Sequence, residues 1–247
     1  MILKSEEEVE RMRVAGKIVA NCLKALEKVI EPGIPTEFLN IIADKEIRKM
    51  NGIPAFLGYR GFPKSICISL NEEVIHGISE YDRLLKDGDL LKIDIGVYYK
   101  GYCADAARTY VVGNALPLHL KLKKVAEDAF EEALSSCKIG GLIRDISSSI
   151  ENYVKKCGFS VVREFGGHGI GKHLHEAPEV LNYVSNNGNI KIKEGMTFCI
   201  EPMVNEGTWE VEILSNGWTV VTKDRKLSSH YENTVAITKN GVEILTR

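Results

Sequence analysis

Asp94 and Asp105 are the first residues in the chain whose types and spacing could do chemistry. They flank a stretch typical of a β-hairpin, with an apolar run at 90–97 and a turn at 98–101. A hairpin centred after Tyr99 would place Asp94 directly opposite Asp105, with Cβ atoms about 4.5 to 5.5 Å apart. Such close carboxylates need a cation between them, and Asp105 could bridge two ions about 3.5 to 4 Å apart. Taken alone, the pair would also fit an exposed hairpin with two solvated aspartates.

A glycine- and histidine-rich segment from Phe165 to His175 is the second candidate. It holds four glycines and three histidines. Glycines on both sides of His168 would let the backbone come close to a bound group. A single histidine in a turn is more often structural, but a short histidine-rich tract suggests metal binding or catalysis.

Two glutamates follow apolar or aromatic residues near the C-terminus. Glu201 lies in Ile200-Glu201-Pro202, and Glu232 lies in Tyr231-Glu232-Asn233-Thr234-Val235. A carboxylate at the end of an apolar strand is costly to bury without a cation. Both glutamates are therefore further candidate ligands.

The four acidic residues also correspond in an internal repeat. At an offset of 107 residues, Gly33 falls on Gly140 and Asp94 falls on Glu201. When the offset is increased by 20 residues, Asp105 falls on Glu232. We expect a single α+β domain over residues 1–247, built from related halves at about 5–112 and 113–247, each of which supplies two carboxylates.

Helix and strand signals support two halves with the same plan. Ser5 and Glu8 form a capping box, and Pro32-Gly33 ends the helix that it begins. The predicted helices cover residues 5–30, 36–50, 117–137 and 144–156. The predicted strands include residues 90–97, 109–112, 197–200 and 235–238.

The composition excludes several classes of protein. The 247 residues are 44% hydrophobic with a formal net charge of -2, which gives no electrostatic argument for nucleic acid or an anionic membrane as a partner. The six cysteines include no C-x-x-C pair, as is usual for reduced, buried thiols. No signal peptide or membrane span is apparent, so we expect a cytoplasmic protein.

Several motifs together resemble those of the methionine aminopeptidases. They include Asp94-Ile95-Gly96, Ala104-Asp105, Phe165-x-Gly167-His168-Gly169-Ile170-Gly171-x-x-x-His175, Val180-x-Asn182-Tyr183, Ile200-Glu201-Pro202-Met203 and Tyr231-Glu232-Asn233-Thr234. The resemblance covers nearly the whole chain. It implies the pita-bread fold, with two pseudo-symmetric halves whose helices pack on a curved antiparallel sheet.

The resemblance implies a site for two divalent metal ions. Asp94 would bind one ion, Asp105 and Glu232 would bridge both, and His168 and Glu201 would complete the second. A carboxylate-rich set with one imidazole favours Co, Fe or Mn, with Zn and Ni as further alternatives. The ions would activate water for attack on the scissile carbonyl, with Glu201 as the implied proton acceptor.

The resemblance also implies how the substrate is held. His76 and His175 would contact the substrate amide and the developing oxyanion, and both would thus act in catalysis. The methionine pocket would be lined by Tyr59, Phe62, Cys67, Leu174 and Trp218. No role is expected for His119 or His230, and His173 is expected to be only a neighbour of the site.

Only 31 residues separate Glu201 from Glu232, which fits the short, bacterial type I form. The expected activity is removal of methionine from nascent polypeptide N-termini with a small second residue. The ribosome is a further candidate partner, and the family expectation is a monomer.

Two other interpretations remain open on the sequence alone. A proline-specific aminopeptidase or prolidase shares the fold, but usually carries an N-terminal domain, and the segment from Gly58 to Cys67 favours methionine. A non-catalytic binding module is the other alternative, although the presence of all five ligands and both histidines argues against it.

Overall fold

The protein is represented by a computed structural model, which describes residues 2–185 and 189–247. The helices are α1 (Glu6–Glu27), α2 (Thr36–Lys49), η1 (Tyr59–Gly61, a 3-10 turn), α3 (Pro117–Ser136) and α4 (Ile143–Lys156). The earlier strands are β1 (Ile53–Pro54), β2 (Cys67–Leu70), β3 (Glu73–Ile75), β4 (Leu90–Tyr99) and β5 (Tyr102–Val111). The later strands are β6 (Ser160–Val161), β7 (Gly166–Gly169), β8 (Glu176–Leu181), β9 (Thr197–Ile200), β10 (Met203–Asn205), β11 (Val211–Ile213), β12 (Val220–Thr222), β13 (Ser228–His230), β14 (Asn233–Thr238) and β15 (Gly241–Ile244).

The four predicted α-helices are all confirmed. The first ends at Glu27 rather than at Ile30, and the others differ from expectation by one residue at one end. The capping box is present, since the Glu8 amide donates to Ser5 Oγ at 3.3 Å and the Ser5 amide donates to Glu8 Oε2 at 2.8 Å. None of the helices in the described chain is long and apolar enough to cross a membrane.

The first half is built around the β4–β5 hairpin, which β2 and β1 extend into an antiparallel sheet. Ile93 and Ile95 of β4, with Ala104 and Ala106 of β5, pack in the core beneath α1 and α2. Because side chains alternate along a strand, Asp94 and Asp105 point to the other face of the sheet. The helices thus cover one face and leave the acidic face for the site.

The predicted register of the β4–β5 hairpin is wrong. Tyr99 pairs with Tyr102, so the turn consists of Lys100 and Gly101, whose φ angles of 44° and 92° are typical of a tight two-residue turn. Asp94 therefore lies opposite Ala107, and Asp105 lies opposite Gly96. The shift amounts to two residues, so both aspartates stay on one face as diagonal neighbours.

The second half repeats this plan around β9 and β14. Together with β7, β8 and β15 they form a five-stranded antiparallel sheet, against which α3 and α4 pack. The last pair of the β9–β14 ladder is Ile200 with Asn233. Glu201 and Glu232 come one step beyond it, at the edge nearest the first half.

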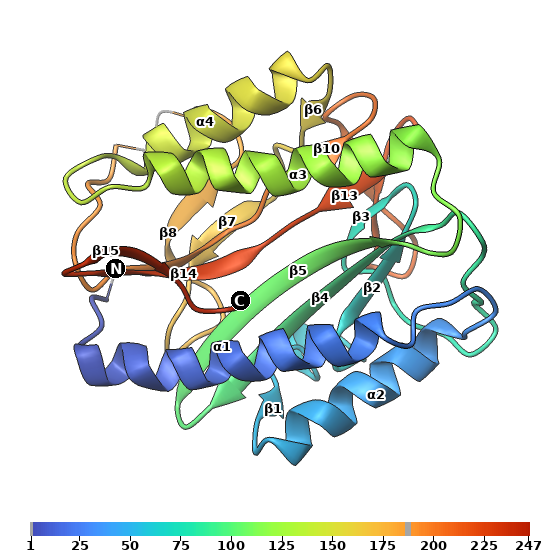
Figure 1. Ribbon diagram of the computed structural model, residues 1–247, viewed down its shortest axis with the longest axis horizontal. Helices are drawn as coiled ribbons and strands as arrows, with labels where there is room; N and C mark the ends of the chain where they lie inside the picture. Colours follow the sequence, from blue (N-terminus) through green and yellow to red (C-terminus); the bar gives the residue numbers. More distant parts are fainter. Residues whose placement is uncertain (1, 186–188) are drawn as a thin grey trace.

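The two halves meet along β5 and β14, which lie side by side in the centre of the molecule (Figure 1). The Asp105 amide donates to Thr234 Oγ1 and that hydroxyl donates to the Asp105 carbonyl, both at 2.8 Å. The Glu232 amide donates to the Ala107 carbonyl at 3.0 Å. These bonds bring acidic residues far apart in sequence to one place.

Candidate metal centre

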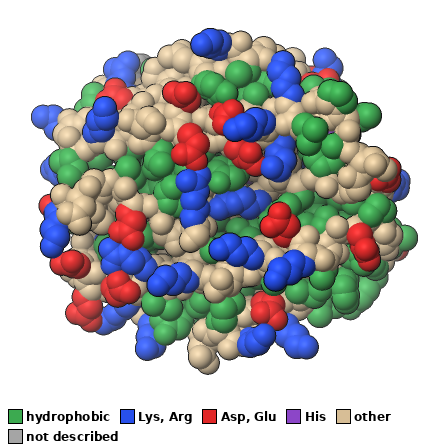
Figure 2. Space-filling model, viewed as in Figure 1, with side chains coloured by type: hydrophobic (Ala, Val, Ile, Leu, Met, Phe, Trp, Pro, Cys, Tyr) green, Lys and Arg blue, Asp and Glu red, His purple; other side chains and the backbone are tan. Residues whose placement is uncertain are grey.

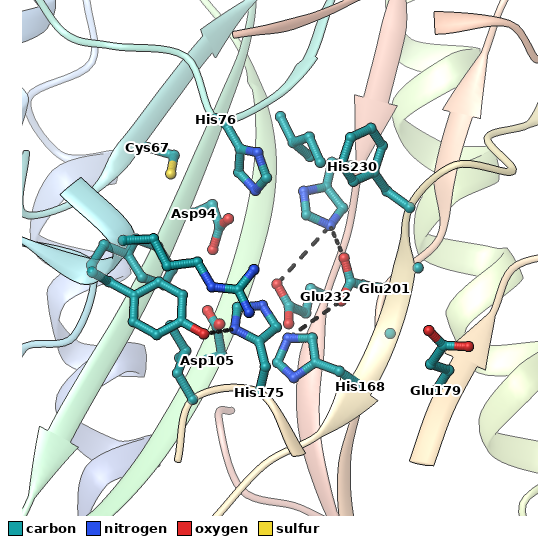
Figure 3. Close-up of a pocket in the computed structure, with 18 of the residues that line it drawn as sticks. Cys67, His76, Asp94, Asp105, His168, His175, Glu179, Glu201, His230 and Glu232 are labelled. Atoms are coloured by element: carbon teal, nitrogen blue, oxygen red, sulfur yellow. Dashed lines mark hydrogen bonds and ion pairs between the residues drawn. The ribbon is translucent and has the colours of Figure 1, made fainter. Parts of the chain in front are cut away.

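Four carboxylates converge where the two halves meet (Figure 3). Asp94 and Asp105 come from β4 and β5, and Glu201 and Glu232 from the ends of β9 and β14. Asp105, Glu201 and Glu232 are 4%, 8% and 2% exposed, and Asp94 is half-buried. The structure thus brings together all four acidic residues that the sequence singled out.

Two overlapping groups of donor atoms have the spacing of metal ligands. Asp105, His168, Cys199 and Glu232 offer atoms within 4.8 Å of one another, and so do Glu201, His230 and Glu232. Glu232 belongs to both groups. Asp94 belongs to neither group, but its side chain lies on the same face of the β4–β5 hairpin as that of Asp105.

His168 is held with one ring nitrogen toward the carboxylates. Its Nδ1 lies 3.0 Å from the Gly169 carbonyl, so we assign Nδ1 as the protonated donor. Its Nε2 lies 3.7 Å from Glu201 Oε1 and keeps a free lone pair. Metal-binding imidazoles are commonly oriented in this way, by a hydrogen bond from the other ring nitrogen to a backbone carbonyl.

The glycines around His168 serve a different purpose from the expected one. A Cβ on Gly167 would lie 2.2 Å from the Cys199 carbonyl oxygen, and one on Gly169 would lie 2.4 Å from the Ala177 carbonyl oxygen. They therefore allow neighbouring strands to pack closely on both sides of His168. Close approach to a ligand is not needed to explain them.

The carboxylates differ in how easily they ionise. Burial, with the negative charges around it, raises the pKa of Asp94 and of Glu232 well above the usual values. Burial likewise raises the pKa of Asp105 to about 6. Burial opposes ionisation of Glu201 too, but the imidazoles of His230 and His168 beside it outweigh this and lower its pKa.

The residues present fit divalent cations. Asp94 Oδ1, Asp105 Oδ1 and Glu232 Oε1 are buried and have no hydrogen-bond partner in the described chain. Buried carboxylate oxygens without partners are rare, because the loss of hydration is uncompensated. Oxygen donors with an imidazole are ligands that Mn, Fe and Co accept.

His230 is the functional candidate that the sequence did not reveal. Its Nε2 lies 3.6 Å from Glu201 Oε2 and 4.0 Å from Glu232 Oε2, and the residue is 1% exposed. Thr109 fixes its backbone, since Thr109 Oγ1 donates to the His230 carbonyl at 2.8 Å. The only signal in the sequence is its place two residues before Glu232.

Cys199 completes one donor group but is a poor candidate ligand. Burial raises the pKa of its thiol well above the usual value. The thiol also lies 3.6 Å from Thr234 Oγ1, between the strands β9 and β14. We interpret it as a core residue, in agreement with the reduced, mostly buried thiols that the sequence indicated.

A cavity of about 560 Å³ leads to the carboxylates. The five residues expected to form the methionine pocket, Tyr59, Phe62, Cys67, Leu174 and Trp218, all line it. The rings of Phe62 and Trp218 meet edge to face at 5.1 Å. Phe56, Ile75 and Phe165 also line the cavity, although the sequence analysis did not place them in the methionine pocket.

His76 and His175 line the same cavity, on different sides of the carboxylates (Figure 3). Burial lowers the pKa of each to about 4, so both rings are neutral at neutral pH. His175 Nδ1 lies 2.9 Å from the Tyr59 hydroxyl. His76 has a φ of 57°, and its ring meets Phe165 edge to face at 5.8 Å.

The other two histidines do not line this cavity. His173 is exposed, and its amide donates to Glu176 Oε1 at 3.1 Å. His119 is buried in α3. Neither side chain is therefore part of the cavity that holds the carboxylates.

The chain matches the model of metallopeptidase family M24 over residues 10–239. It is 50% identical to the methionine aminopeptidase of Clostridium acetobutylicum, across 100% of this chain and 98% of that protein. It is 44% identical to the methionine aminopeptidase of Escherichia coli K12, across 99% of this chain and 93% of that protein.

The fold of this chain also matches solved structures. The methionine aminopeptidase of Thermotoga maritima matches with a TM-score of 0.97 and 39% identity, over 100% of this chain and 99% of that one. A prolidase from Pyrococcus horikoshii matches with a TM-score of 0.77 and 25% identity, over 100% of this chain but only 63% of that one.

Proposed function

Because the chain belongs to metallopeptidase family M24, we propose that it removes the N-terminal methionine from nascent polypeptides whose second residue is small. The observation that carries the proposal is the buried acidic centre, with its unpartnered carboxylate oxygens, in a cavity that aromatic and aliphatic side chains also line. Relatives that are 44 to 50% identical over 93 to 98% of their length carry the name methionine aminopeptidase, which supports methionine as the residue removed.

In this proposal Asp94, Asp105, His168, Glu201 and Glu232 hold two divalent ions. The two donor groups share Glu232, which supports a bridging role for this residue. Ions bound there would polarise the scissile carbonyl and lower the pKa of water toward neutrality. His230 lies against Glu201 and Glu232 and would keep these carboxylates in position.

Glu201 is the proposed proton acceptor. Its pKa is lowered while those of its three acidic neighbours are raised, so it stays ionised when they compete for protons. Its two oxygens face different imidazoles, His168 and His230. Such fixed orientation favours proton transfer to and from a group held beside it.

His76 and His175 are the proposed hydrogen-bond donors to the substrate. We assign the Tyr59 hydroxyl as the donor to His175 Nδ1, which leaves the proton of the neutral ring on Nε2. A neutral imidazole can donate to a developing oxyanion without the cost of burying a charge. His76 lies across the carboxylates from His175 and can contact the other side of the peptide group (Figure 3).

The apolar end of the cavity is the proposed methionine pocket. Phe62, Cys67 and Leu174 are at most 5% exposed, so their side chains are already packed before a substrate arrives. A thioether gains about 0.3 to 1.5 kcal/mol from contacts with aromatic rings such as Trp218 and Tyr59. The His168 and His175 rings, 4.1 Å apart, would restrict the residue that follows methionine.

Peptide cleavage tests the substrate. We expect release of methionine from Met-Ala-Ser, slower release from Met-Leu-Ser, and no cleavage of an Xaa-Pro peptide. Cleavage of the Xaa-Pro peptide without release of methionine would instead support a prolidase-like activity.

Chelation and reconstitution test the metal centre. Metal-free protein should be inactive, and titration with Mn, Fe, Co or Zn should show binding of two ions per chain. Asp105→Ala should abolish this binding, whereas His173→Ala, an exposed histidine beside the site, should leave it unchanged. A protein that binds no divalent ion at about micromolar concentration would contradict the proposal.

A further inference from the structure

A second cavity lies on the opposite face of the central strands from the metal centre. It measures about 430 Å³ and is lined by residues of α1, β5, α3 and the C-terminal segment. Arg108 and Tyr110 of β5 line it. Because side chains alternate along β5, they point away from the face that carries Asp105. Figure 2 shows Lys and Arg side chains gathered in the middle of this face, between the positions of α1 and α3.

Positive charge exceeds negative charge in this cavity. Its lining contains four cationic side chains, Lys24, Arg108, Lys123 and Arg247, and two acidic ones, Glu27 and Glu127. Lys123 pairs with Glu127 at 2.5 Å, and Arg247 pairs with Glu131. Lys24 makes no ion pair in the described chain.

Arg108 forms the inner end of the cavity without a carboxylate partner. Its guanidinium lies 4.5 Å from the centre of the Tyr231 ring. Its two terminal nitrogens donate only to neutral oxygens: the carbonyls of Ala107, Glu232 and Thr246, and the amide of Asn233. These bonds hold the group but do not neutralise its charge, and an unbalanced, largely buried cation is costly.

Arg247 and the hydroxyl of Tyr110 also line this cavity. Arg247 Nη2 lies 3.3 Å from the Tyr231 hydroxyl, so both guanidiniums meet one tyrosine. The Tyr110 hydroxyl has no hydrogen-bond partner in the described part of the chain. An anion in the cavity would reduce the repulsion between Arg108 and Arg247 and give this hydroxyl an acceptor.

We propose that the cavity between α1 and α3 is a binding site for a small phosphate-bearing anion, with Arg108 at its inner end and Lys24, Lys123 and Arg247 around it. Guanidinium, ammonium and hydroxyl groups bind phosphate in proteins. Lys24, Arg247 and the Tyr110 hydroxyl would supply the hydrogen bonds. Arg108 would act through its charge, because its terminal N–H groups already donate to four oxygens. The volume suits a small molecule. The site lies on the other face of β5 from Asp105, and it touches the metal centre only through backbone, since Arg108 donates to the Glu232 carbonyl.

Thermal unfolding of the chelated protein in inorganic phosphate tests the site. Chelation removes metals that would bind phosphate, and the acidic residues of the metal centre then repel it. The melting temperature of the wild type should rise with phosphate up to about 50 mM at constant ionic strength, as expected for a ligand that binds only the folded state. Chloride at the same ionic strength should not produce this rise.

Lys24→Glu is the test variant, since its exposed position allows normal folding. It should weaken phosphate binding roughly tenfold or more, because a positive charge at the cavity is reversed. Lys45→Glu on α2 makes the same change of charge at an exposed residue outside the cavity and should retain wild-type binding. Equal phosphate effects in the two variants, or no effect in the wild type, would overturn the proposal.

Discussion

At the scale of single residues, the candidate metal centre consists of buried carboxyl groups whose ionisation is unfavourable unless a cation is bound. Asp105 and Glu232 are nearly inaccessible to solvent and each leaves one oxygen without a partner. Protonation partly relieves this, as the raised pKa values of both groups indicate. Divalent ions would relieve it more fully, so metal binding and proton release should be linked.

The chelated protein should therefore lose stability as the pH rises. The folded pKa of Asp105, about 6, lies above its unfolded value, so its contribution is present at low pH and is lost as the pH passes through about 6. We expect the melting temperature of the chelated protein to fall between about pH 4 and 7. Asp105→Asn should reduce this fall, and an undiminished slope in that variant would contradict the assignment.

His230 should affect metal binding although it was not expected in the site. Loss of a residue that orients metal ligands typically weakens affinity by about 10- to 100-fold. We expect His230→Ala to weaken binding of Mn or Co within this range, as measured by calorimetric titration of the chelated protein. His173→Ala is the control, and equal affinities in the two variants would exclude the role.

At the scale of elements, a buried ion pair fastens the N-terminal segment to the strand that follows the histidine-rich loop. Lys4 Nζ lies 2.6 Å from Glu176 Oε2, with side-chain exposures of 3% and 6%. Gly171 allows this contact, because a Cβ there would lie 2.3 Å from Lys4 Cε. The pair thus holds the loop between β7 and β8, which carries His175.

Glu176→Gln should destabilise the protein by about 3 to 5 kcal/mol, the usual cost of removing one partner of a buried ion pair. Burial opposes ionisation of Glu176, but the bond from Lys4 prevails and lowers its pKa. The stabilisation is therefore present above the unfolded pKa of about 4.3 and is lost as the pH falls below it. Urea unfolding should show the variant and wild type converging in acid, while Glu210→Gln, at an exposed pair, should match the wild type throughout.

At the scale of the whole molecule, the pita-bread fold expected from the sequence is confirmed by its likeness to the solved structures. Its halves lie with α1 and α2 along one side and α3 and α4 along the other (Figure 1). The C-terminal segment returns across α1 at Gly16, where a Cβ would lie 2.0 Å from the Leu245 carbonyl oxygen. The chain end is therefore part of the contact between the halves.

Gly16→Ala should destabilise the molecule despite the better helix propensity of alanine. The propensity gain is about 1 kcal/mol, whereas overpacking typically costs about 1 to 3 kcal/mol and here involves backbone on both sides. Urea unfolding should show a lower midpoint for Gly16→Ala than for the wild type. Lys17→Ala, an exposed change in the same helix, should not lower it.

The sequence by itself determined the helices, the acidic and histidine residues that are candidate ligands, and the correspondence between the halves. These depend on caps, periodicity and residue types, which act over a few residues. Only the tertiary structure decided the hairpin register, which the φ angles of Lys100 and Gly101 set, and the placement of His230. His230 reaches the centre through Thr109, 121 residues away, and no local pattern encodes a contact between strands so far apart in the chain.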